Sequence, residues 1–242
     1  MWRTPSNSTQ LKNRVVAAIG YAIAEFKRNR RLYPIESTKS DPPKQNPKIE
    51  NFYSTYKSPE EDAILAPEFE KLISDLGVEP DDIVVLILAW KFKGSAMCQF
   101  THSEFVDGCT SLNVTDIASL KRALPTLRSS ISSESDFAEF YRWSFTYYQE
   151  EERSKKLPTD TCVAMYELLL KGKFPNLEEW LDFLNKKNAP FITQDTWNLT
   201  LDFFKEVRTD YSNFDAESAW PLLLEQFVEW VKGGKPSLSK KK

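Results

Sequence analysis

The chain has 242 residues, a formal net charge of −3, 41% hydrophobic and 13% aromatic residues, and seven glycines. This length and apolar content suffice for a substantial core in one or two domains and exclude a disordered chain. The near-neutral charge supplies no basic field for nucleic acid, and the longest apolar run, 83–90, is too short to span a bilayer. Three cysteines without a short spacing predict reduced thiols inside a cell.

The first 48 residues differ in composition from the remainder. Residues 1–33 carry one acidic residue, Glu25, against seven basic ones, and their apolar residues recur at helical spacing. Three interpretations of this basic segment stay open: a mitochondrial transit peptide, a nuclear localisation or acidic-lipid patch at 27–31, and a variable extension. Residues 34–48 are rich in proline and small polar residues, which is typical of a linker.

From Ile49 onward the hydrophobic pattern indicates a helical domain. The spacing predicts helices over 52–57, 67–76, 83–92, from 102 through 105, 117–124, 137–148, 162–170 and 175–185. Gly77 and Gly172 are expected to end helices, Thr159 or Asp160 to cap one, and Pro125 to end or kink another. Residues 83–92 are apolar almost all round, so this helix should be central and buried.

Two helix–loop–helix segments repeat at a spacing of 36 residues. Ile64 precedes Glu68 by four positions and Phe100 precedes Glu104 by four, as loop positions 8 and 12 do in a paired EF-hand. A calcium loop also needs oxygen ligands at positions 1, 3 and 5 and glycine at position 6. Those positions hold Lys57, Pro59, Glu61 and Asp62 in the first loop and Lys93, Ser95, Met97 and Cys98 in the second. We therefore expect an all-α fold with two tandem EF-hand-like helix pairs without calcium, followed by a C-terminal helical subdomain.

The stretch 195–230 is predicted to form two amphipathic helices joined by a turn. The first should begin near Thr193, whose hydroxyl can cap it, and the second at Pro221. The expected buried stripes are Trp197, Leu201 and Phe204 in the first and Leu223, Phe227 and Trp230 in the second. Glu225 lies about 200° around the helix from Leu223 and should face water. With Asp195 in the first turn and the small Ala219 near the second start, the pair is either a docking platform for a basic partner or a plain soluble helix pair.

Patterns of catalysis and metal binding are weak. His102 lies four residues after Cys98, but two ligands do not make a zinc site. A catalytic Cys98–His102 pair is less favoured than a buried Cys98 and a surface His102 at a helix start. The sequence has no glycine-rich phosphate loop, GxSxG elbow or HExxH motif. We therefore expect no catalytic residue, no metal and no cofactor, and the sequence indicates a binding protein.

Several separated stretches resemble the defective-in-cullin-neddylation family. They are 85–92 (VLILAWKF), 98–108 (CQFTHSEFVDG), 195–198 (DTWN), 201–203 (LDF), 212–215 (SNFD), 219–221 (AWP) and 227–229 (FVE). The resemblance predicts a potentiating-neddylation domain over 49–232, preceded by a variable extension and linker (1–48) and followed by a disordered basic tail (233–242). It implies a scaffold-type ligase component without a catalytic residue of its own. Such a component would bind a cullin and the modifier-charged conjugating enzyme and promote transfer of the ubiquitin-like modifier to a cullin lysine.

The resemblance implies two sites. The family's acidic–Ala–acidic patch for the winged-helix domain of a cullin corresponds to Asp195, Ala219 and Glu225, the last in place of the usual Asp. A second site, an apolar pocket for the acetylated N-terminal Met of the conjugating enzyme, corresponds to Phe69, Val85, Leu88, Ala89, Phe92, Cys98, Phe100, Phe105, Tyr147, Met165 and Leu168. Phe69 and Met165 depart from the family's usual aliphatic and Tyr residues. From the residues alone, plain core packing explains all of these apolar positions.

The same resemblance sets the expected partners and location. We expect a monomer in the nucleus and cytoplasm, with no nucleic-acid or membrane partner. Residues 1–48 show no three-helix pattern of a ubiquitin-associated domain, so ubiquitin binding is not expected. The alternative function is a calcium-independent EF-hand-like helical adaptor for an unrelated amphipathic or acetylated peptide.

Overall fold

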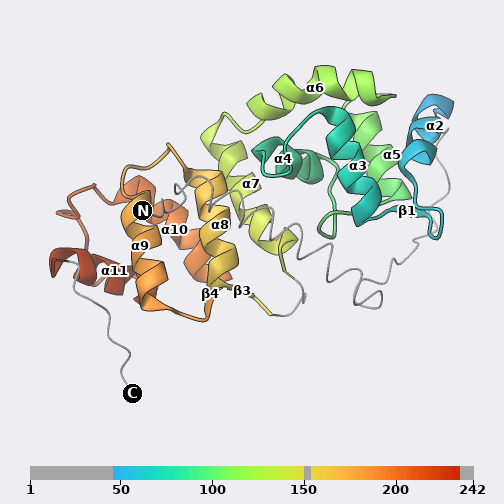
Figure 1. Ribbon diagram of the computed structural model, residues 1–242. Coiled ribbons are helices and arrows are strands. Elements are labelled where there is room, and N and C mark those ends of the chain that lie inside the picture. Colours follow the sequence, from blue (N-terminus) through green and yellow to red (C-terminus); the bar gives the residue numbers. More distant parts are fainter. Residues whose placement is uncertain (1–45, 150–153, 235–242) are drawn as a thin grey trace, which may run out of the picture. The chain divides into compact units, whose positions relative to one another are not determined.

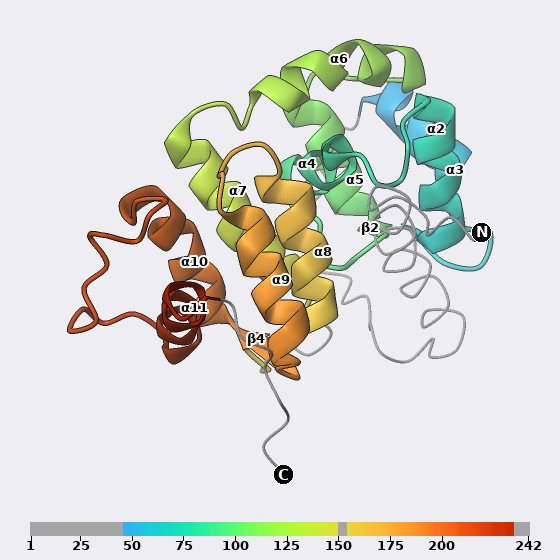
Figure 2. The same ribbon diagram turned by 60° about the vertical axis from the view of Figure 1, so that its left-hand side comes forward.

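The computed structural model describes residues 46–149 and 154–234 (Figures 1 and 2). This part of the chain is all-α apart from four short strands, which confirms the predicted fold class. None of its helices is long and apolar enough to cross a membrane. The predicted N-terminal extension and the basic tail lie outside the described residues, except for 46–48, 233 and 234. The described residues divide into two compact units, with the boundary between Phe140 and Tyr141.

The first unit contains two short strands, each followed at once by a helix. Its elements are α2 (Pro47–Tyr56), β1 (Ala63–Ile64), α3 (Ala66–Leu76), α4 (Ile83–Lys91), β2 (Phe100–Thr101), α5 (His102–Ser111), α6 (Ile117–Ser129) and the first half of α7 (Glu134–Tyr147). β1 and β2 pair antiparallel, with Ile64 opposite Phe100. The two residues assigned to equivalent loop positions from the sequence are therefore direct partners in the structure.

Helix ends in this unit follow local chemistry. Gly77 ends α3 in the left-handed conformation (φ 72°), as predicted. The first helix begins earlier than predicted, because the Asn46 side chain accepts a hydrogen bond from the Lys48 N–H and Pro47 takes the first helical position. The proposed linker therefore ends before residue 47. The prediction that Pro125 ends its helix was wrong: α6 continues to Ser129. Pro125 is exposed, so the carbonyl that loses its partner can face water.

Phe105 on α5 lies at the centre of the first unit's aromatic core. Its ring centroid is 5.1 Å from that of Phe52, 5.7 Å from Phe92 and 6.5 Å from Phe100. The predicted central helix α4 supplies a continuous buried run, from Val84 to Ala89. The core therefore joins α2, the end of α4, α5 and β2.

The second unit repeats the arrangement of the first. Its elements are the second half of α7, β3 (Lys156–Pro158), α8 (Thr159–Leu170), α9 (Leu177–Lys187), β4 (Phe191–Thr193), α10 (Gln194–Glu206) and α11 (Leu222–Lys232). β3 and β4 pair antiparallel, with Leu157 opposite Ile192, and each again leads directly into a helix. The expected cap of α8 was wrong, because Pro158 is the N-cap and no side chain caps that end. This second strand pair was not predicted from the sequence.

Trp197 on α10 organises the core of the second unit. Its ring stacks on Tyr141 at 4.6 Å and on Tyr166 at 4.4 Å between centroids. The Trp197 Nε1–H donates to the Tyr141 carbonyl (3.0 Å), and the Tyr141 hydroxyl donates to the Trp197 carbonyl (2.8 Å). Because all three rings are fully buried, these reciprocal bonds fix α10 firmly against α7 and α8.

Candidate functional site

Asp195 lies in the first turn of α10, at a helix end that is built as predicted. The Thr193 hydroxyl caps the helix by accepting a hydrogen bond from the Thr196 N–H (3.1 Å). Asp195 is exposed, and the positive end of the helix dipole favours its negative charge. The carboxylate is therefore free for a partner on a helix whose start is fixed by β4 and the Thr193 cap.

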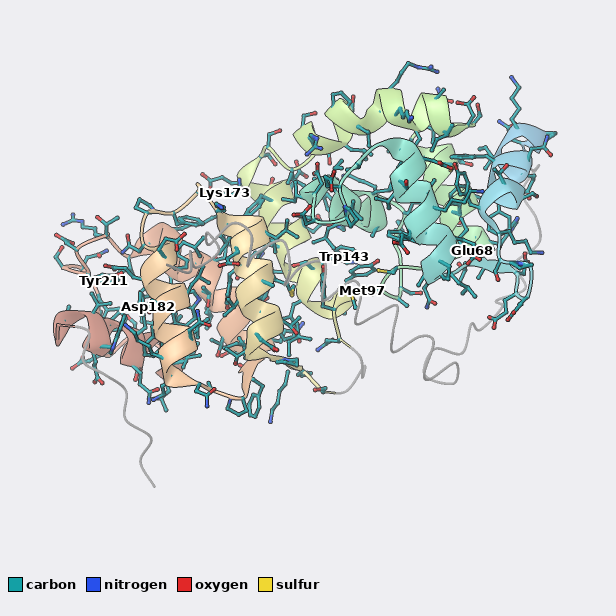
Figure 3. All side chains as sticks on the ribbon, viewed as in Figure 1. Glu68, Met97, Trp143, Lys173, Asp182 and Tyr211 are labelled. Atoms are coloured by element: carbon teal, nitrogen blue, oxygen red, sulfur yellow. The ribbon has the colours of Figure 1, made fainter. Side chains whose placement is uncertain are left out.

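Residues 207–221, here called the α10–α11 loop, are fixed along their first half by side-chain hydrogen bonds. Asn213 accepts from the Arg208 N–H (2.8 Å) and donates to the Glu206 carbonyl (2.9 Å). Tyr211 (labelled in Figure 3) adopts a left-handed conformation (φ 56°). Its hydroxyl donates to Glu179 Oε2 on α9 (2.7 Å). Burial, and then this bond, raise the pKa of Tyr211 above its ordinary value. The loop is thus held against α9 although it contains no regular element.

The second half of the loop presents Ala219. Asp215 accepts hydrogen bonds from the Glu217 N–H (2.9 Å) and from the Ser218 hydroxyl (3.0 Å). Trp220 then packs its ring against Phe203 of α10, with 5.6 Å between centroids. Ala219 itself is exposed between these two anchors. A small side chain at this point leaves room for a partner to approach the backbone closely.

Glu225 completes the predicted set from the first turn of α11. The helix begins at Leu222 after Pro221, whose carbonyl accepts from the Leu224 N–H (2.8 Å). Leu224 is fully buried and Leu223 only half-buried, so the predicted buried stripe is rotated by one residue at this end. Glu225 is consequently half-buried, and the prediction that it faces water freely was too simple.

The surface formed by α10, the α10–α11 loop and α11 is strongly acidic. Residues 194–232 contain three basic residues, Lys205, Arg208 and Lys232, and eight carboxylates, Asp195, Asp202, Glu206, Asp210, Asp215, Glu217, Glu225 and Glu229. Asp202 is paired with Arg142 of α7 at 3.7 Å. This surface can attract and hold a basic partner, which is the chemistry expected of the acidic–Ala–acidic set.

The residues proposed for the apolar pocket are almost all core residues. Phe69, Val85, Leu88, Ala89, Phe92, Cys98, Phe100 and Phe105 are buried in the first unit, whereas Tyr147 and Met165 are buried and Leu168 is half-buried in the second. Within the first unit, Phe100 contacts both Phe69 (5.6 Å between centroids) and Phe92 (5.2 Å). These positions therefore contribute to packing, and their role as a peptide pocket stays a prediction.

Cys98 and His102 do not form a catalytic pair in their observed environments. Burial, and then the nearby Glu70, raise the pKa of the Cys98 thiol to about 12, which disfavours the reactive thiolate. His102, the first residue of α5, lies 2.9 Å from Glu50 and packs edge-on against Tyr53 of α2. The prediction of a buried Cys98 and a His102 at a helix start is confirmed, but His102 is half-buried and not on the surface as predicted.

In the second EF-hand-like loop, residues 93–104, the glutamate at position 12 binds the loop's own backbone. Glu104 accepts hydrogen bonds from the Ser95 N–H and from the Thr101 N–H, both at 2.8 Å. Cys98 occupies the position-6 turn with φ 57°, a conformation that usually selects glycine. Residues 46–149 and 154–234 contain no group of three or more Asp, Glu, His or Cys side chains placed to hold a metal ion.

Comparison with known proteins identifies the family to which the chain belongs. Residues 119–230, which include Asp195, Ala219 and Glu225, match the family described as cullin binding. DCN1-like protein 3 of Xenopus laevis is 37% identical over 187 residues, covering 76% of this chain and 62% of that protein. DCN1-like protein 3 of Homo sapiens is 36% identical over the same length, and human DCN1-like protein 5 is 36% identical over 182 residues, covering 75% of each chain.

The helical fold and the matched region define a protein with a domain of the cullin-binding class. This chain belongs to the DCN1-like family. It spans 62% of the length of the DCN1-like protein 3 relatives.

Proposed function

We propose that this protein is a non-catalytic scaffold that binds the winged-helix domain of a cullin through Asp195, Ala219 and Glu225. The observation that carries the proposal is the fixed acidic surface on α10, the α10–α11 loop and α11. Its carboxylates can pair with Lys or Arg of the partner, while the small Ala219 admits close contact. The match of this region to the cullin-binding family supports the same assignment.

We propose further that the protein binds the neddylation conjugating enzyme through that enzyme's acetylated N-terminal Met. The eight apolar residues named above in the first unit and the three named in the second are the proposed contacts. Holding the modifier-loaded conjugating enzyme close to the acceptor lysine of the cullin raises their effective concentration. The transfer therefore needs no covalent intermediate on this protein. The three cysteines are buried thiols that form no disulfide, in keeping with a reducing compartment, and we place the protein in the nucleus and cytoplasm.

Reconstituted cullin modification with and without this protein tests the proposal. We expect wild-type protein to accelerate modification, and more so with an acetylated than with an unacetylated conjugating enzyme. The double variant Asp195→Lys with Ala219→Arg should lose cullin binding and stimulation yet stay folded, because both positions are exposed. Its free energy of unfolding should fall by no more than about 2 kcal/mol, the cost of reversing a charge in the first turn of α10.

Asp160→Lys is the matched control. Asp160 is also exposed in the first turn of a helix that directly follows a strand of this unit, but on α8. It should bind cullin as wild type does. Full stimulation by the double variant would refute the assignment of the site, and no stimulation by wild-type protein would refute the proposed function.

A further inference from the structure

Leu222, the first residue of α11, is the most exposed large apolar side chain of the described residues. It is 66% exposed, compared with 41% for Phe191, the other one of this kind. Phe191 is partly covered by Lys156, whose Nζ lies 4.1 Å from the ring centroid. A single exposed leucine is common on protein surfaces. Leu222 differs in its position, three residues after Ala219 and three before Glu225.

The backbone on both sides of Leu222 is fixed. The Ser218 carbonyl accepts from the Trp220 N–H (2.8 Å), and the Trp220 ring rests on Phe203. On the other side, the Pro221 carbonyl accepts from the N–H groups of Leu224 (2.8 Å) and Glu225 (3.3 Å). Leu222 is therefore held at a defined place while its own side chain stays uncovered. A contact residue presented in this way loses little backbone entropy when a partner binds.

The charged residues near Leu222 indicate what kind of partner would cover it. Glu225 and Glu229 follow it by three and seven residues, so both lie on the same side of α11 as Leu222. Asp215 and Glu217 in the α10–α11 loop are also exposed. An apolar side chain surrounded by carboxylates has the composition of a small interface, with an apolar centre and a charged rim.

We infer that Leu222 is the apolar anchor of the cullin-binding surface and enters an apolar depression bordered by Lys or Arg on the cullin winged-helix domain. The inference rests on the proposed function, and it adds a contact that the acidic–Ala–acidic set does not contain. Leu222 supplies short-range affinity and position, whereas the carboxylates attract the basic rim over a longer range.

The test is the affinity of the full chain for an isolated cullin winged-helix domain at low and high salt. Leu222→Ala and Leu222→Gln should each bind on the order of tenfold more weakly, and Leu222→Met should bind within about twofold of wild type. The salt dependence should stay unchanged in these variants, because no charge is removed. Glu225→Gln should instead flatten the salt dependence.

Phe191→Ala is the matched control, since it removes the other exposed large apolar side chain, and it should leave the affinity unchanged. Binding of Leu222→Ala and Leu222→Gln within twofold of wild type would overturn the inference. So would an equal loss in Phe191→Ala. If the double variant Asp195→Lys with Ala219→Arg still abolishes binding in that case, the cullin site stands and only the anchor fails. A wild-type protein that binds no cullin domain refutes the proposed function itself.

Discussion

Gly108 on α5 offers the sharpest test of the first unit's core. A Cβ built on Gly108 would lie 2.4 Å from both Cγ and Cδ1 of Phe92, closer than real Cβ atoms approach their neighbours. Phe92 is 1% exposed and is flanked by Phe100 and Phe105, with ring centroids at 5.2 and 5.7 Å, so its ring has little room to move. Gly108→Ala should therefore overpack the core.

Two opposing effects determine how much Gly108→Ala changes the free energy of unfolding. Alanine is favoured over glycine inside a helix by about 1 kcal/mol. Overpacking a close-packed core costs about 1–3 kcal/mol, and the enclosed Phe92 ring favours the upper part of that range. We expect Gly108→Ala to lower the free energy of unfolding by about 1–2 kcal/mol, measured from urea unfolding with an unchanged m-value.

Two variants serve as controls for this experiment. Thr110→Ala, on the exposed side of α5, should change the free energy of unfolding by no more than about 0.5 kcal/mol. In a Phe92→Leu background, which makes room beside residue 108, Gly108→Ala should cost clearly less than in wild type. A Gly108→Ala protein that is more stable than wild type by about 1 kcal/mol would show that helix propensity alone operates and that Phe92 does not enclose Gly108.

Two further predictions concern single contacts. Arg128 donates to both carboxylate oxygens of Asp82 (2.7 and 2.5 Å). Burial alone would raise the pKa of Asp82. The hydrogen bonds from Arg128 and from the Val84 N–H outweigh burial, so the pKa of Asp82 is lowered. Because the folded pKa lies below the unfolded one, this stabilisation is complete above about pH 4 and is lost as the pH falls through the folded value. Asp82→Asn should cost about 1 kcal/mol in urea unfolding at pH 7 and less at low pH; an equal cost at both would contradict the charge pairing. Thr193→Ala should remove the cap of α10 and lower the free energy of unfolding by about 1 kcal/mol, whereas Thr193→Ser should melt at nearly the wild-type temperature. Equal melting temperatures for all three proteins would rule out a stabilising cap.

The sequence was sufficient at two helix ends, because the left-handed Gly77 and the capping Thr193 follow from residue type and position alone. It was not sufficient at Asn46 and Pro158, whose capping positions are equally local and were missed. The repeat of apolar residue and glutamate marked Ile64 and Phe100 as equivalent loop positions, and the structure shows that they pair. The second strand pair was not predicted because that repeat is absent there. Four residues after Leu157 and Ile192 the chain has Thr161 and Thr196 instead of glutamates. The only sequence pattern for this strand pair was the occurrence of two apolar residues, Leu157 and Ile192, 35 positions apart.

In the candidate site, too, some features could be predicted from the sequence and others could not. Asp195, Ala219 and Glu225 could be named from the sequence, because the resemblance supplies their positions. The hydrogen bond from Tyr211 to Glu179 joins residues 32 apart and depends on side-chain orientations that no short pattern determines. The half-buried state of Glu225 depends on where α11 begins relative to Pro221, and a shift of one residue rotates the helix face by about 100°.

The rigidity of the acidic surface depends on one side chain more than on any carboxylate. Phe203 of α10 contacts Trp220 at 5.6 Å, Phe214 at 6.1 Å and Phe227 of α11 at 6.1 Å between ring centroids. The helix that begins near Asp195, the loop that presents Ala219 and the helix that carries Glu225 therefore share one buried contact point. A partner that binds three residues on separate segments must otherwise order those segments, which weakens association. Here folding has already ordered them, so the proposed partner would meet segments that Phe203 holds together.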